Sequence, residues 1–404
     1  MPALPGNCKR NEMADQIQVA ALRGAAGKPG RLAYIDWLRG LACLGMFQAH
    51  CYNSWLNADA KTSEFYRWSQ AVATLPAPLF IFLAGTSTAL VTQRLRDKGV
   101  ARNAIARTTI LRGAEIFALG LLFRGQEYLL GYPKSPWTDL LRVDVLNMLG
   151  LSMMLLGVLC WLTAAATPEK SSTRAIFWGL PLAAAIAIVT PWLWTTHQPR
   201  WLPWPIESYI NGVHIYAQPQ VWLFPIFPWV AFAFVGLAVG FLLFSDFART
   251  KEIAVFVAIG AAGVAASLLS LLFDAAPTRL YSATIYDYWH TSPNFFLMRC
   301  GVLLALVFLA YAWCRWGGAQ RGFSPVIQLG NTSLLVYWVH IEFVYGRFSI
   351  LPKGKCNILK ATAGFLVIFL AMLALSMLRT RWKKRRATAL RASREPAAAT
   401  VGSG

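Results

Sequence analysis

The sequence predicts an all-α protein, a polytopic integral membrane helix bundle of about ten transmembrane helices. Of its 404 residues, 56% are hydrophobic and only 14% are charged. Apolar runs of about 20 residues recur along the chain, which is the length that an α-helix needs to cross the hydrocarbon core of a bilayer. Basic residues gather in the short segments between these runs, as they do in multi-pass membrane proteins. These three patterns favour a membrane protein over a soluble multidomain protein.

The apolar runs place the spans in order along the chain. The predicted spans are residues 32–54, 70–93, 106–128, 144–165, 174–195, 222–244, 252–273, 294–314, 325–346 and 358–378. The preceding polar segment shows no apolar core of a cleaved signal peptide, so the first span is expected to serve as the insertion signal. We therefore divide the chain into a cytoplasmic segment at 1–30, a transmembrane domain at 31–378 and a basic cytoplasmic tail at 379–404.

The distribution of Lys and Arg predicts the orientation. Basic residues cluster before the first span, between the second and third spans, and after the tenth. An even number of spans puts these three segments on one side, which the positive-inside rule identifies as the cytoplasm. The expected location is the cell inner (cytoplasmic) membrane, with both termini cytoplasmic and the lipid bilayer as a partner. This topology accounts for the net charge of +20, and contact with anionic lipid accounts for the basic tail. No nucleic-acid partner is therefore predicted.

Several chemistries lack their sequence signals. The seven Cys include no CxxC pair, so neither a disulfide framework nor a zinc site is predicted, and no other metal is expected. The chain also contains no P-loop, no HExxH and no GxSxG motif. Nucleotide hydrolysis, zinc proteolysis and a serine nucleophile elbow therefore have no support.

Ionisable residues in the first predicted span are the strongest candidates for function. Asp36, Arg39 and His50 lie in a segment that is otherwise typical of a membrane helix, and charges at membrane depth cost about 2.5–3.5 kcal/mol each on insertion scales. Arg39 and His50 are eleven residues apart, so they leave the same helix face about 16 Å apart along the axis. An ion pair between Asp36 and Arg39, with Arg39 reaching the interface, is the structural alternative.

Polar residues on other spans could converge with this face when the helices bundle. There are structural alternatives for two of these sites. Arg112 could form an ion pair with Glu115, and His340 could serve simply as a hydrogen-bonding group between helices. The candidates on these spans are Arg112, Arg142, Asp144, Asn147, Arg299 and His340.

Five sequence blocks in a fixed order resemble a known family. They lie at 35–41 (with Met46 and His50 following), 77–87, 143–150, 224–229 and 329–340. The set resembles the bacterial membrane proteins related to lysosomal heparan-α-glucosaminide N-acetyltransferase, within the wider transmembrane acyltransferase superfamily. The chain departs from the lysosomal enzyme at His50, where that enzyme has Asn. Arg39 and His50 instead match the paired Arg and His in the first helix of the O-antigen acetylase branch.

The resemblance implies an acyltransferase domain at 31–378 that moves an acetyl group from cytoplasmic acetyl-CoA to an amine or hydroxyl of an extracytoplasmic saccharide. His50 would be the general base or a covalent acetyl carrier, with Asp36 as a second catalytic candidate. Arg39, Arg112 and Arg142 would bind the donor, because guanidinium groups suit polyphosphates. Asp144, Asn147, Arg299 and His340 are further site candidates.

Two other classes of protein remain open from the sequence. A transporter or exporter of a small molecule, lipid or glycan could use the same charged residues as a proton relay. A mainly structural or partner-binding membrane protein is the third alternative. The sequence also leaves the oligomeric state open, with a homodimer among the alternatives.

Overall fold

The computed structural model confirms an all-α protein over the residues that it describes. These are 32–197, 201–212, 224–275, 281, 285, 287–317 and 322–392. Within them the ordered segments are helices, and no β-strand occurs. The predicted cytoplasmic segment at 1–30 and the last residues of the tail, 393–404, lie outside the described residues. The chain divides into two compact units, Met1–Ala73 with Gly317–Gly404, and Thr74–Trp316, so the predicted transmembrane domain at 31–378 includes all of the second unit and part of the first.

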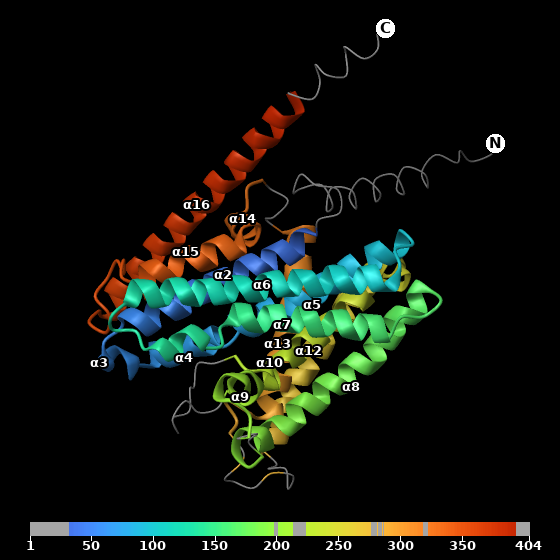
Figure 1. Ribbon diagram of the computed structural model, residues 1–404, viewed down its shortest axis with the longest axis horizontal. Coiled ribbons are helices and arrows are strands. Elements are labelled where there is room, and N and C mark those ends of the chain that lie inside the picture. Colours follow the sequence, from blue (N-terminus) through green and yellow to red (C-terminus); the bar gives the residue numbers. More distant parts are fainter. Residues whose placement is uncertain are drawn as a thin grey trace, which may run out of the picture. The chain divides into compact units, whose positions relative to one another are not determined.

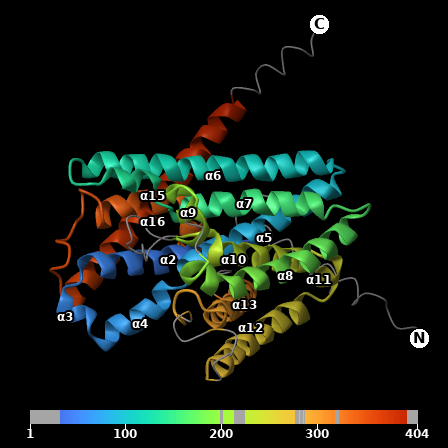
Figure 2. The same ribbon diagram turned by 60° about the horizontal axis from the view of Figure 1, so that its bottom comes forward.

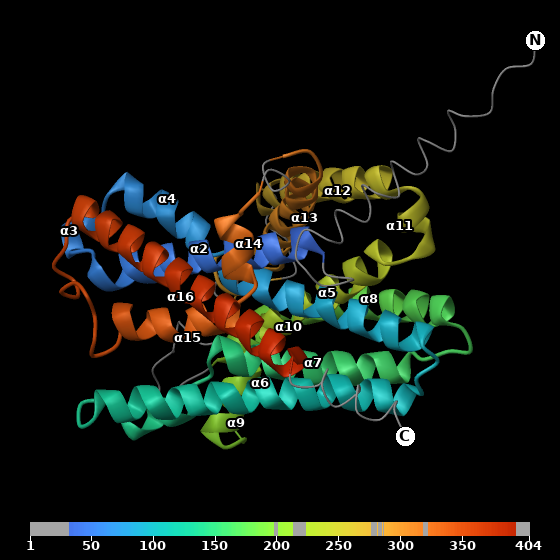
Figure 3. The same ribbon diagram turned by 90° about the horizontal axis from the view of Figure 1, so that it is seen from above.

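The first unit combines the two ends of the chain. Its helices are α2 (Ala33–Trp55), α3 (Ala58–Lys61), α4 (Glu64–Ala73), α14 (Pro325–Gly330), α15 (Ser333–Val344) and α16 (Ile358–Ala392), labelled in Figure 1. Helix α2 packs against α14, α15 and α16, and Figure 3 shows α16 crossing α15. The contacts between α2 and the α14–α15 segment occur in the same order along both segments. Gly330 contacts Asp36, and further along the chain Val344 contacts Ser54. The two segments therefore run parallel, the relative direction expected for the predicted first and ninth spans.

The break between α14 and α15 is closed by side chains of α16. Ser376 donates from its hydroxyl to the backbone carbonyl of Gln328 at 2.8 Å, and Thr332 donates to the Ser376 hydroxyl at 2.6 Å. An interrupted helix in a membrane protein needs such partners, because the freed backbone groups otherwise stay unsatisfied. The ninth predicted span, 325–346, is thus two short helices rather than one.

Gly330 allows α14 to approach α2 closely. A Cβ atom added to Gly330 would lie 1.8 Å from the backbone oxygen of Asp36. We expect Gly330→Ala to lower the free energy of unfolding by about 1–3 kcal/mol, the usual cost of overpacking. The measurement is the thermal midpoint of the purified protein in detergent. Gly125→Ala is the matched control, because a Cβ there meets nothing within 4 Å; equal midpoints for the two variants would contradict the close packing.

The second unit is built from helix pairs. Its helices are α5 (Pro76–Asp97), α6 (Arg102–Gly131), η1 (Trp137–Leu141), α7 (Val145–Leu162), α8 (Pro168–Thr195), α9 (Trp204–Asn211), α10 (Ile226–Leu243), α11 (Asp246–Thr250), α12 (Glu252–Ala275) and α13 (Pro293–Trp316). Figure 2 shows α6 beside α7, and α12 packs on α13. Helices α10 and α5 pack closely at Gly236 and Gly240, where a Cβ on Gly236 would lie 2.0 Å from the Phe82 carbonyl oxygen.

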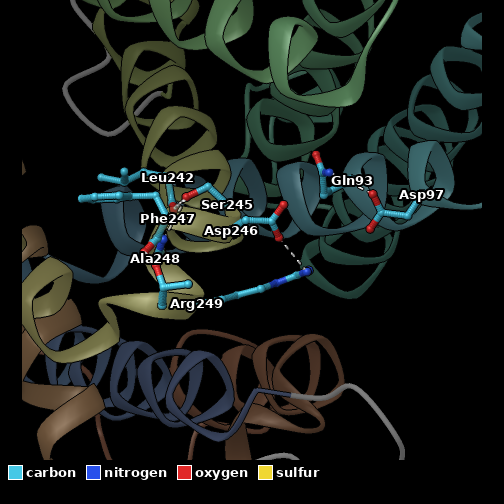
Figure 4. A network of polar contacts seen from close by, with 9 residues as sticks. Gln93, Asp97, Leu242, Ser245, Asp246, Phe247, Ala248 and Arg249 are labelled. Carbon is cyan, nitrogen blue, oxygen red and sulfur yellow. Dashed lines mark hydrogen bonds and ion pairs between the residues drawn. The ribbon is translucent and has the colours of Figure 1, made fainter.

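Short polar contacts order one end of α5 and the turn after α10. Gln93 donates to Asp97 at 2.9 Å on α5, and the Ser245 hydroxyl accepts from the Ala248 amide at 3.2 Å to cap α11. Arg249 pairs with Asp246 at 3.0 Å (Figure 4). Side-chain capping satisfies amide groups at a helix start that have no partner within the helix.

Seven helical segments of the described residues are long and apolar enough to cross a membrane, so the chain is a multi-pass membrane protein. They coincide with the second, fourth to eighth and tenth predicted spans. The count of about ten is not confirmed. Helices α2 and α6, with 23 and 30 residues, are long enough to cross, but polar side chains lower their hydropathy. The ninth predicted span contains the shorter apolar helix Ser333–Val344.

Candidate functional site

Helix α2 holds the polar residues of the first predicted span in one continuous helix. The guanidinium of Arg39 pairs with the Asp36 carboxylate at 3.3 Å. Asp36 is buried, with 1% of its side chain exposed, whereas Arg39 keeps 29%. The predicted structural ion pair is therefore present. The Arg39 side chain is thus only partly covered by the protein.

At the other end of α2, His50 meets His340 of α15. The Nδ1 atom of His50 lies 2.9 Å from Nε2 of His340, within the range of a strong hydrogen bond. The two ring planes differ by 5°, and the ring centroids are 5.1 Å apart. The distance between the ring centroids exceeds the distance between the two bonded nitrogens by about one ring diameter. The rings therefore meet edge to edge. Such an arrangement directs the nitrogen lone pair of one ring at the N–H of the other.

Backbone geometry fixes the direction of this hydrogen bond when both rings are neutral. The Nδ1 atom of His340 lies 2.9 Å from the Val336 carbonyl oxygen, and a carbonyl can only accept, so Nδ1 of His340 carries the proton. A neutral imidazole has one donor and one acceptor nitrogen, which makes Nε2 of His340 the acceptor. His50 must then donate from Nδ1, leaving its Nε2 unprotonated. Among the described residues, no hydrogen-bond partner occupies that Nε2.

The surroundings hold this histidine pair in place. His340 is fully buried, and Phe47 packs on its ring at a centroid distance of 4.8 Å. Tyr345 packs edge-on against His50 at 5.3 Å. One turn beyond His50, the Ser54 hydroxyl donates to the Val344 carbonyl at 2.8 Å and locks the register of the two helices. His50 itself remains half-buried, so one side of its ring stays reachable.

The candidates of the second unit have visible structural roles. Arg112 forms an ion pair with Glu115 at 2.8 Å, and both side chains are more than half exposed.

Asp144 caps α7 by accepting from the Leu146 amide at 3.2 Å, and Asn147 completes the capping box. The Asn147 side-chain amide also donates to the Phe117 carbonyl at 3.1 Å. Arg142 is half-buried just before α7.

Asp144 also forms an ion pair with Arg124 of α6, at 3.7 Å. Arg124 was not among the predicted site residues, because nothing in the sequence distinguishes it from the other basic residues near the ends of predicted spans. The remaining candidate, Arg299, is buried in α13, and its guanidinium lies over the rings of Phe295 and Trp229. In the described part of the chain, no group of three or more His, Cys, Asp or Glu side chains is arranged to hold a metal ion.

Comparison with known protein families finds one match. Residues 31–264 match the family model described as heparan-alpha-glucosaminide N-acetyltransferase, catalytic. This range covers more than half of the chain and includes all of α2. The chain belongs to this family. Membership in the heparan-alpha-glucosaminide N-acetyltransferase family makes it a membrane acetyltransferase by class. The match ends before α15, so His340 lies outside it. No curated protein matches the chain.

The structure thus joins four of the nine predicted site residues in two separate pairs at opposite ends of α2: Asp36 with Arg39, and His50 with His340 of α15. The pairing of the two histidines was not predicted from the sequence. His340 was a candidate by residue type, but its partner lies 290 positions away in the chain. The Val336 carbonyl, which sets the direction of the hydrogen bond, carries no signal in the sequence at all.

Proposed function

We propose that the protein transfers an acetyl group from cytoplasmic acetyl-CoA to an amine or hydroxyl of an extracytoplasmic saccharide. The predicted topology, in the inner membrane with both termini cytoplasmic, would put Arg39 near the cytoplasmic end of α2 and His50 in its outer half. The family match supports the reaction class. The observation that supports the site best is the hydrogen bond between His50 and His340, which leaves Nε2 of His50 unprotonated when both rings are neutral.

In the proposed reaction, Nε2 of His50 takes the proton of the acceptor amine or hydroxyl. The acceptor heteroatom attacks the thioester carbonyl carbon, and the tetrahedral intermediate collapses with cleavage of the C–S bond. The CoA thiolate leaves and receives the proton from the His50 imidazolium, which returns the ring to its neutral state. During the step, the Nδ1–H bond to His340 lets the positive charge spread over two rings, and the Val336 carbonyl stabilises it.

A covalent route uses the same nitrogen. Nε2 of His50 attacks the thioester carbonyl, the C–S bond breaks, and the acetyl group resides on His50 until the acceptor attacks it. The proton on Nδ1 moves towards Nε2 of His340, which neutralises the acetylated ring. When the acceptor attacks, the bond between Nε2 and the acetyl group breaks, the proton returns from His340 to Nδ1 of His50, and the proton of the acceptor passes to the CoA thiolate. Both routes need the same orientation of His50. Trapping with acetyl-CoA labelled in the acetyl group, in the absence of acceptor, distinguishes them.

We assign donor binding to Arg39 and, as a second candidate, to Arg112. In the proposed topology both lie in the cytoplasmic half of their helices, and a guanidinium can form paired hydrogen bonds with phosphate oxygens. Asp36 would hold Arg39 in position rather than take part in proton transfer. Arg142 precedes α7, whose start faces outward in this topology, so we no longer assign it to the cytoplasmic donor.

Arg39→Gln is expected to raise the KM for acetyl-CoA at least about tenfold and to leave kcat within about twofold. The reason is that a hydrogen-bonded charge is worth about 1.5–3 kcal/mol, and Arg39 would contact the donor rather than the reacting atoms. Steady-state kinetics and calorimetric CoA binding are the measurements. Asp36→Asn is the comparison, because it breaks the ion pair and keeps the guanidinium, and it should weaken CoA binding less than Arg39→Gln does. A similar loss of affinity in both variants would mean that the ion pair matters only structurally.

Mass spectrometry of envelope glycans tests the proposed function even while the acceptor is unidentified. Deletion of the gene should remove acetyl groups from an extracytoplasmic glycan, and the wild-type gene should restore them. Membranes from the deletion strain then contain the unmodified acceptor and provide the assay for variants with labelled acetyl-CoA. An unchanged acetylation pattern, with a glycan or lipid accumulating on the wrong side of the membrane, would instead support an exporter.

A further inference from the structure

Arg299 is a buried cation without an anionic partner. Only 9% of the residue is exposed, and among the described residues it forms no ion pair and no hydrogen bond. The internal segments outside the described residues, 198–200, 213–223, 276–280, 282–284, 286 and 318–321, contain no Asp or Glu in the sequence. Arg is almost never buried unless it is paired. The second unit therefore holds a positive charge that the surrounding chain does not neutralise.

Two aromatic rings lie near this guanidinium. Its central carbon lies 3.9 Å from the ring centroid of Phe295 and 5.6 Å from that of Trp229. Such cation–π contacts are worth about 0.5–2 kcal/mol each, whereas burying an ion costs several kcal/mol after relaxation. The rings thus offset only part of the cost. They do hold the planar group in one orientation and leave its nitrogens free.

The nitrogens differ in how a ligand could reach them. Nε is fully buried and lacks a hydrogen-bond partner. The two terminal nitrogens also lack partners among the described residues, but they are not among the fully buried atoms. Arg299 lies six residues after the start of α13 at Pro293, or about 9 Å along the axis. The aromatic residues Tyr288 and Trp289, which precede α13, are of the kind that gathers at membrane interfaces.

We propose that Arg299 binds an oxyanion, a carboxylate or phosphate group, within the second helical unit. A guanidinium fork pairs with both groups through two parallel hydrogen bonds. The oxyanion would enter from the end of α13 that the proposed topology faces outward. It could belong to a soluble acidic compound or to the headgroup of an anionic lipid. This site does not depend on acetyl transfer, because it lies on other helices than the histidine pair.

Arg299→Met separates a ligand site from a structural role. If Arg299 serves to bind a ligand, its buried charge destabilises the unliganded protein. Removing that charge should then leave the melting temperature of the unliganded variant equal to or above that of the wild type. If the aromatic contacts of Arg299 stabilise the fold, the variant should melt lower. Arg249→Gln, which changes an arginine whose side chain is 57% exposed, is the matched control and should leave the midpoint unchanged.

Ligand-dependent melting then tests the site directly. Glucuronate or inorganic phosphate, added at constant ionic strength, should raise the wild-type and Arg249→Gln midpoints in a saturable way, whereas Arg299→Met should not respond. Glucose is the uncharged comparison. A rise seen only in nanodiscs with phosphatidylglycerol, and not with phosphatidylcholine, would identify a lipid headgroup as the ligand. The proposal is overturned if no oxyanion raises the midpoint in either arm, if Arg299→Met responds equally, or if unliganded Arg299→Met melts well below the wild type.

Discussion

Replacing His50 with Gln is expected to lower the rate of acetyl transfer by about 10²–10⁴, the usual contribution of a positioned general base. Gln resembles His in size and can keep a hydrogen bond to His340, but it can neither take a proton nor carry an acetyl group. The measurement is transfer of label from acetyl-CoA in membranes of the deletion strain. CoA binding and the amount of inserted protein should stay near wild-type values.

His197→Gln is the matched control, because this histidine is exposed and contacts Thr196 instead of another histidine. It should retain wild-type transfer. Retention of wild-type transfer by His50→Gln would rule out proton and acetyl chemistry at this position. His340 would then be the remaining imidazole of the pair, although its burial makes direct contact with an acceptor difficult.

Replacing His340 with Met is expected to lower transfer about 10–100-fold, by analogy with the loss that follows removal of a hydrogen-bond partner that orients a metal-binding histidine. Met fills a similar volume but offers His50 no strong acceptor, so the His50 ring loses its preference for one tautomer. His340→Gln places an amide oxygen within reach of Nδ1 of His50, so this variant should recover most of the rate.

Nitrogen-15 NMR of histidine-labelled protein gives a readout that a purely structural role would not change. The signals of His50 are identified by their absence in His50→Gln. In the wild type at neutral pH they should report a protonated Nδ1 and an unprotonated Nε2. His340→Met should shift them towards a mixture of tautomers, and His340→Gln should preserve the wild-type pattern. An unchanged tautomer in His340→Met would show that His340 does not orient His50.

The fold class and the chemistry available on α2 could be predicted from the order of residues alone. Apolar runs of membrane-spanning length are a local property, so they are visible directly in the sequence, and seven of them are helices long and apolar enough to cross a membrane. The ion pair of Asp36 with Arg39 was also foreseeable, because residues three apart on a helix are neighbours. Where polar residues lower the hydropathy, as in α2 and α6, the same signal weakens and the count of spans becomes uncertain.

Which distant residues meet depends on how the helices pack. Gly40 and Gly330 let α2 and α14 approach to backbone contact, and this approach sets the register that puts His340 beside His50. The direction of their hydrogen bond depends on a carbonyl group, which every residue has, so no pattern of residue types could reveal it.

Burial likewise separates arginines that look alike in the sequence. Arg112 belongs to an exposed ion pair, and Arg39 is partly exposed beside a buried carboxylate. Arg299 is buried and forms no ion pair within the described part of the chain. Their neighbours in sequence do not distinguish the three, because the packing of residues from distant segments determines how much water each guanidinium keeps.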